Sequence, residues 1–60
     1  MINISKNTHA VVLDNVKKGD FVRCESGKMG EVVAVQVLAH NTQKEYFYKI
    51  KDEGVILIIK

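Results

Sequence analysis

The chain has 60 residues, a net charge of +2 at neutral pH and a single cysteine. A domain of this length buries only about 60% of the surface that its unfolded chain exposes, so we expect one small domain with a small core. The single cysteine excludes an internal disulfide, no Cys/His cluster has zinc-site spacing, and the weak, dispersed charge argues against a strongly basic nucleic-acid binder. Small folds without such cross-links often gain stability from other chains, so we expect a protein partner or self-association.

The N-terminal residues have no charged segment followed by a long apolar run, and no stretch approaches the length of a membrane span. We therefore expect neither a signal peptide nor contact with a membrane. Together with the free thiol, this pattern favours a cytoplasmic protein, or a virion protein if the chain is encoded by a phage.

Valine and isoleucine dominate the apolar residues, and no window shows the sustained three- and four-residue spacing of an amphipathic helix. Residues branched at Cβ pack well on a pleated sheet and lose rotamer freedom in helices. The pattern predicts an all-β fold, either a five-stranded small barrel or a strongly bent antiparallel sheet. Residues 1–60 form this single domain, and residues 1–8 are a loose N-terminal arm or a short extra strand.

The first predicted strand spans His9–Leu13 and ends at the turn-forming pair Asp14-Asn15, with a short piece at Ile2–Ile4 before it. The chain is organised around the segment that follows, Val16–Val35. Glycine-marked turns and apolar stretches alternate in this segment, which predicts a turn, a short strand, a tight hairpin turn and a longer strand. The two strands are Phe21–Glu25 and Met29–Leu38.

Alternation along the first of these two strands places Val22 and Cys24 on the core face and Phe21, Arg23 and Glu25 on the outer face. The longer strand is apolar on both faces, which is unusual for a strand exposed on one side. It therefore either bends, so that its two halves face the core differently, or has one face covered by another chain.

The last two predicted strands are Lys44–Lys51 and Val55–Ile59, with a turn at Asp52-Glu53-Gly54 between them. The final strand is continuously apolar, so its burial requires this chain's own N-terminal strand or another subunit. The strand before it alternates cleanly. Its inward side chains are Tyr46, Tyr48 and Ile50, and its outward side chains are Glu45, Phe47, Lys49 and Lys51.

The segment Val16–Val35 resembles the KOW motif, in which a hydrophobic residue and a Gly-Asp pair precede a hydrophobic position, glycines and a second hydrophobic strand. The residues that carry the resemblance are Gly19, Asp20, Val22, Gly27, Gly30 and Val32. The resemblance implies a Src-homology-3-like barrel of bacterial or phage origin. KOW modules that bind RNA usually carry extra basic residues between the glycines, whereas this loop holds only Lys28. The chain also resembles small β-rich phage capsid-decoration proteins, which share the Gly-Asp-x-Val start and a glycine-led apolar strand, here Gly54 to Ile59.

Two sets of residues place an aromatic side chain beside cations on the predicted outer face. Surfaces that combine stacking with positive charge bind single-stranded nucleic acid. The alternative is that the phenylalanines cover a second small core or a subunit interface. The two sets are Phe21 with Arg23, and Phe47 with Lys49 and Lys51.

The remaining polar residues have simpler interpretations. Cys24 is expected to be a small buried hydrophobe, His9 and His40 surface histidines, and Asp20 a turn-stabilising carboxylate. Turn lysines either contact phosphates or keep the surface soluble; they are Lys17, Lys18 and Lys28.

No catalytic, cofactor-binding or metal-binding constellation is recognisable, so we expect no enzyme activity and no cofactor. The first hypothesis is a small binding module that contacts nucleic acid or a nucleic-acid-processing protein through the aromatic and basic outer face. The alternative is an oligomeric structural or assembly protein, such as a phage capsid-decoration or accessory subunit.

Overall fold

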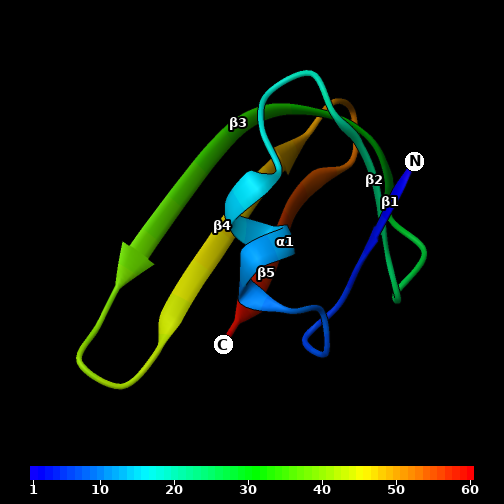
Figure 1. Ribbon diagram of the computed structural model, residues 1–60. Helices are drawn as coiled ribbons and strands as arrows, with labels where there is room; N and C mark the ends of the chain where they lie inside the picture. The colour runs from blue at the N-terminus through cyan, green and yellow to red at the C-terminus, as the bar shows by residue number, and fades with distance from the viewer.

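The structure, a computed structural model, describes all 60 residues and contains one five-stranded sheet and one short helix (Figure 1). The strands lie in the sheet in chain order, and no hydrogen-bonded pairing joins the first strand to the last. The fold is therefore all-β, as predicted, with a bent sheet that is not closed into a barrel. The elements are β1 (Ile2–Ile4), α1 (Ala10–Asn15), β2 (Phe21–Cys24), β3 (Met29–Ala39), β4 (Lys44–Ile50) and β5 (Gly54–Ile59).

The short N-terminal piece is a true strand, but its pairing differs from a purely antiparallel sheet. β1 pairs with β2 in parallel, with Ile2 opposite Val22 and Ile4 opposite Cys24. A parallel connection needs a crossover of a dozen or more residues, and the segment that holds α1 supplies it. The other three strand pairs are antiparallel.

The helix α1 occupies most of the stretch that the sequence predicted as the strand His9–Leu13, so that prediction is wrong. In an alternating strand, Val11 and Leu13 would share a face, yet Val11 is 65% exposed and Leu13 is 1% exposed. Leu13 is the one buried residue of α1, and the next buried residue, Val16, follows the helix as its C-cap with an extended backbone. Six residues are too few for a helix to be stable alone in water, so its packing on the sheet overrides the β propensity of its valines.

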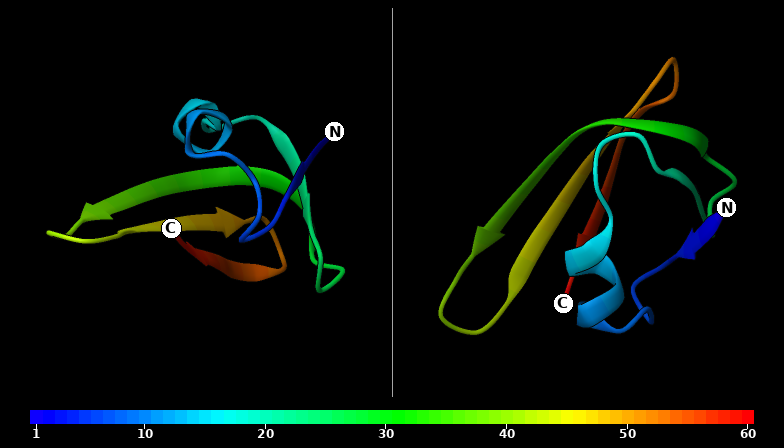
Figure 2. Two further views of the ribbon diagram at one scale, coloured as in Figure 1. Left: turned by 60° about the horizontal axis from the view of Figure 1, so that its bottom comes forward. Right: turned by 45° about the horizontal axis from the view of Figure 1, so that its top comes forward.

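The core lies between α1 and the face of the sheet that α1 covers, which we call the inner face (Figure 2). The predicted inward alternation of β4 is confirmed, because its three inward side chains are at most 1% exposed. The only helix of the chain has six residues, far fewer than a membrane-spanning helix requires. The ten buried side chains are Ile4, Leu13, Val16, Val22, Val32, Tyr46, Tyr48, Ile50, Ile56 and Ile58.

The long strand β3 bends, which is one of the two explanations offered for its apolar faces. Its register with β4 shifts between Val32 and Ala34, a β-bulge that lets one part pair with β2 and the other with β4. Gly30 precedes the bulge with φ of 151°, and a Cβ atom there would lie 2.9 Å from Cγ2 of Ile50. Only glycine fits this backbone and this close approach.

The sequence predicted that β5 is buried by the N-terminal strand or by another subunit. The first alternative is wrong, because β1 pairs only with β2, and the second stays a prediction. Ile56 and Ile58 are buried beneath α1, whereas Val55, Leu57 and Ile59 are 47%, 50% and 46% exposed. These three side chains lie on the opposite face of the sheet. The uncovered apolar side of β5 therefore belongs to the surface of the molecule.

Two buried tyrosines of β4 tie α1 to the sheet. The Tyr48 hydroxyl donates a 2.7 Å hydrogen bond to the Leu13 carbonyl, and the Tyr46 hydroxyl donates a 2.8 Å bond to the Asp14 carboxylate. The Lys44 ammonium lies 3.5 Å from the same carboxylate. Burial is the main cause that raises the pKa of Tyr48 to about 12, and burial also raises the pKa of Tyr46.

We predict that Tyr48→Phe lowers the free energy of unfolding by about 1–2 kcal/mol, because it removes a buried hydrogen bond to the helix. Tyr46→Phe is the matched control and should cost less, since the half-exposed Asp14 keeps Lys44 and water as partners. Urea unfolding followed by circular dichroism measures both. Equal losses for the two variants would contradict the prediction.

The stabilisation by the Tyr48 hydroxyl should also depend on pH. Because the pKa of Tyr48 is raised in the folded state, this stabilisation is complete below pH ~10 and is lost as the pH rises towards 12.

Candidate functional site

The face of the sheet turned away from α1, which we call the outer face, carries the side chains predicted to bind a ligand. On β4, Phe47 and Lys49 point outward between the buried residues of the strand. The register places Phe47 between Gln36 of β3 and Leu57 of β5. A shallow hollow of about 460 Å³ lies here, and the half-buried Phe47 forms part of its wall. The hollow is lined by Ala34, Val35, Gln36, Phe47, Lys49 and Val55.

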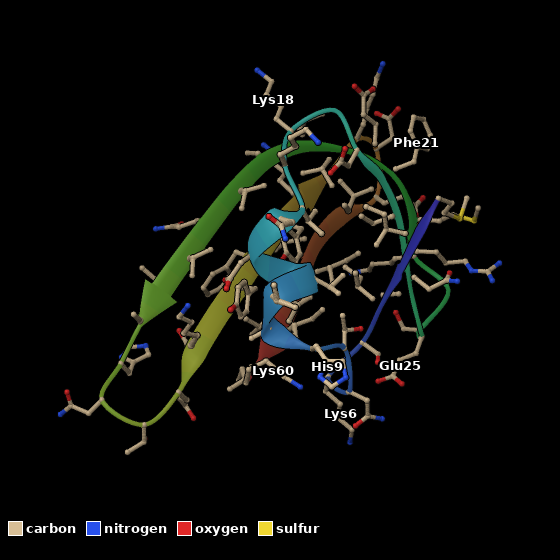
Figure 3. The ribbon with its side chains drawn as sticks, viewed as in Figure 1. Lys6, His9, Lys18, Phe21, Glu25 and Lys60 are labelled. Atoms are coloured by element: carbon tan, nitrogen blue, oxygen red, sulfur yellow. The ribbon has the colours of Figure 1, made fainter.

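The second predicted set lies on β2, at the other end of the bent sheet (Figure 3). Phe21 is 55% exposed and pairs with Glu31 of β3, while Arg23 pairs with Met29. The backbone N–H of Lys51 donates a 2.9 Å hydrogen bond to the Glu31 carbonyl. Phe21, Glu31 and Lys51 therefore lie in one row across three neighbouring segments, and this row connects the two predicted sets.

The three outward cations of the site have no acidic partner. The ion pairs of the chain involve other basic residues, so Arg23, Lys49 and Lys51 are free to meet an anion. The outer face also contains Glu31 and Glu45, so the positive charge is local rather than a continuous field. The arrangement can stack a planar group on Phe47 and hold an anionic group beside it.

An apolar band borders the same site. Val55, Leu57 and Ile59 of β5 lie opposite Lys49, Phe47 and Glu45 of β4, and all three are about half exposed. Contiguous exposed apolar side chains rimmed by charges often mark a contact with another protein. The outer face therefore combines two kinds of surface, one aromatic and basic, the other aliphatic.

Of the other candidates, Asp20 has a structural role, and His9 and His40 are exposed, as predicted. The Asp20 carboxylate accepts a 3.0 Å hydrogen bond from the Lys17 backbone N–H and lies 3.3 Å from the Lys17 ammonium, and the backbone bond is the main cause that lowers the pKa of Asp20. This is the turn-stabilising geometry expected for it. His40 lies 3.4 Å from Glu45, and His9 precedes α1 without a side-chain capping bond. No group of three or more His, Cys, Asp or Glu side chains is placed to hold a metal ion.

Cys24 has a more polar environment than the expected buried hydrophobe. It is half-buried, packs against the core and lies with its Sγ atom 2.9 Å from the Ser26 hydroxyl. Burial raises the pKa of the Cys24 thiol, but hydrogen bonds from the Ser26 hydroxyl and from the backbone amides of Ser26, Lys28 and Gly27 lower it by more. The hairpin turn after Cys24 was predicted from the sequence, but the hydrogen bonds that its Ser26 hydroxyl and its backbone amides give to the thiol were not.

Comparison of the chain with protein-family models, with curated proteins and with solved structures finds no match. The resemblance to the KOW motif and to phage decoration proteins therefore stays a prediction.

We predict that Cys24 reacts with a thiol reagent at a lower pH than an ordinary cysteine does, because the thiolate receives several hydrogen bonds. The measurement is the reaction rate with a chromogenic disulfide between pH 5 and 10, for the folded chain and for the chain unfolded in urea. Ser26→Ala should move the midpoint of the folded chain towards that of the unfolded chain. A folded midpoint at or above the unfolded one would refute the prediction.

Proposed function

We propose that this protein is a small non-catalytic binding module that contacts single-stranded nucleic acid through its outer face. The observation that supports this proposal is the position of Phe47 at the wall of a hollow, beside the unpaired cation Lys49. A base stacked on Phe47 would leave its phosphate near Lys49 or Lys51. Base stacking on an aromatic side chain contributes about 1–3 kcal/mol and is tolerant of sequence, which suits a surface with few hydrogen-bonding groups.

The row that runs from Lys51 through Glu31 to Phe21 extends the same surface towards β2. Phe21 and Arg23 would then contact nucleotides further along the strand, so the ligand follows the bend of the sheet. With three unpaired cations in the path, the expected salt dependence is modest. The logarithm of the affinity should fall with the logarithm of the salt concentration with a slope of about −2.

We predict that Phe47→Ala weakens binding of a labelled ten-nucleotide single strand at least fivefold, because the stacking surface is removed. Lys49→Glu should weaken binding and reduce the salt slope by about 0.7, the contribution of one phosphate. Fluorescence anisotropy at several salt concentrations measures both quantities.

Lys6→Glu is the matched control, because it makes the same change of charge far from Phe21 (Figure 3). It should alter the affinity much less than Lys49→Glu does. Equal effects of the two charge reversals would show that any attraction is non-specific, and the absence of binding by the unchanged chain would refute the proposal.

A second candidate function is supported by the apolar band of β5. Val55, Leu57 and Ile59 would be buried if copies of the chain, or this chain and a larger structure, met through this surface. Their exposure is the observation that favours a structural or assembly protein, such as a phage decoration or accessory subunit. Obligate assemblies bury apolar surfaces of this kind.

This second candidate predicts a stable oligomer that Leu57→Lys converts to a folded monomer, because the Leu57 side chain points outward. Ile58→Lys is the contrasting variant and should unfold the chain, since Ile58 is 5% exposed in the core. Light scattering after size-exclusion chromatography gives the mass, and circular dichroism gives the folded fraction. A monomer at all concentrations would remove the support for assembly.

A further inference from the structure

The last strand has one edge without a strand partner. The backbone groups of Lys44 and Lys60 exchange two hydrogen bonds of 2.9 Å, and the register of β4 with β5 is regular. In an antiparallel pair, every second residue points its N–H and C=O groups at the neighbouring strand. The intervening residues Val55, Leu57 and Ile59 therefore point theirs away from β4, into the open seam between β5 and the β1–β2 end of the sheet.

A groove of about 440 Å³ follows this seam. The free edge of β5 forms one wall, and Cys24 is part of the wall opposite. The groove thus joins apolar side chains to a row of backbone donors and acceptors that have no strand partner. The lining residues of the opposite wall are Ser5, Lys6, Cys24, Glu25, Ser26 and Lys28.

Two lysine ammonium groups cross the seam, one at each end. Lys28 donates a 3.3 Å hydrogen bond to the Val55 carbonyl, and Lys60 donates a 2.8 Å hydrogen bond to the Lys6 carbonyl. Neither ammonium group is paired with a carboxylate. Since Glu25 is the one acidic residue that lines the groove, the seam carries a local excess of positive charge.

This charge decides between the two kinds of strand that could pair with β5. A second copy that paired its own β5 antiparallel about Leu57 would bring Val55 opposite Ile59, and hence Lys28 of one copy close to Lys60 of the other. Like charges at both ends of such an interface oppose it. An extended segment with carboxylates at those two places would be attracted.

We propose that the free edge of β5 binds an extended acidic peptide segment of another protein by strand addition, at a site that shares Val55 with the hollow at Phe47 but runs along the edge of the sheet. The peptide backbone pairs with Val55, Leu57 and Ile59, and its carboxylates replace the carbonyl oxygens as partners of Lys28 and Lys60. The distance along β5 from Val55 to Ile59 is about 13 Å, so the two acidic residues lie four positions apart on one side of the peptide.

The test uses the unchanged chain and a capped peptide in which two glutamates flank a threonine-valine-threonine segment. Amide hydrogen exchange, followed residue by residue by NMR, reads out the pairing. Binding should slow exchange at Val55, Leu57 and Ile59 at least tenfold and leave Ile56 and Ile58, which already pair with β4, nearly unchanged. Slowing without this alternation, or no slowing at peptide concentrations up to the millimolar range, would overturn the proposal.

Two control peptides separate the parts of the proposal. Replacing both glutamates by glutamine should weaken binding at least tenfold. N-methylation of the peptide amides that face β5 should abolish binding, whereas N-methylation of the alternate amides should leave it intact. Equal binding of the glutamine peptide would overturn the acidic specificity. Protection of the same three amides on raising the protein concentration alone would identify a second copy as the occupant and overturn the proposal as well.

Two charge variants test the lysines without touching the core. Lys28→Gln and Lys60→Gln should each weaken the glutamate peptide several-fold while leaving binding of the glutamine peptide unaltered. The rate at which Cys24 reacts with a thiol reagent gives an independent readout, because its side chain lines the groove and a bound peptide should protect it. No nucleic acid is present in these measurements, so their failure is distinct from failure of the nucleic-acid proposal.

Discussion

The packing of α1 on β4 is the contact on which the rest of this structure depends. In a small closed barrel, the first and last strands meet and cover the interior. Here a six-residue helix covers it instead, held by buried Leu13 and by the hydroxyls of Tyr46 and Tyr48. Because the core is already closed by the helix, β1 and β5 have no need to pair, and the seam between them stays open.

The small size of the chain explains why so much apolar surface remains outside. Only 10 of 60 residues are buried, so one layer of side chains on the inner face makes up the whole core. β5 leaves Val55, Leu57 and Ile59 uncovered on its outer face. On β3, Val35 and Val37 stay partly exposed on the inner face itself, opposite Tyr48 and Tyr46. The functional hypotheses all concern this leftover surface, either the outer face around Phe47 or the free edge of β5.

The free edge of β5 is open both to unwanted pairing with other chains and to binding of a specific partner. An unpaired apolar strand invites pairing with other chains, and natural proteins often protect such edges with lysines. Lys28 and Lys60 lie at the two ends of the β5 edge and bond to backbone carbonyls across the seam. The same two charges that repel another copy of the strand attract an acidic one, so protection of the edge and selection of a partner have one physical origin.

Much of the candidate site was accessible from residue patterns alone. The alternation along β4 correctly placed Phe47 and Lys49 outward, since a side chain's face in a strand depends only on its position in a two-residue repeat. The distance between the two aromatic sets was not accessible. This distance depends on the bulge after Val32, where one extra residue changes the direction of β3. The two-residue repeat of a strand does not show where the strand bends or by how much.

Local sequence was sufficient for the positions of β2 to β5 and for the inward side chains, because turns and alternation are short-range properties of the chain. Local sequence was insufficient for α1, because Val11 and Val12 have strand propensity. The helix is stabilised by tertiary contacts instead: the Leu13 side chain is buried in the core, and the Leu13 carbonyl accepts a hydrogen bond from Tyr48, thirty-five residues away in sequence. The parallel pairing of β1 with β2 and the groove between Cys24 and β5 also join residues that are far apart in the sequence. Such contacts join distant parts of the chain, so only the folded molecule determines them.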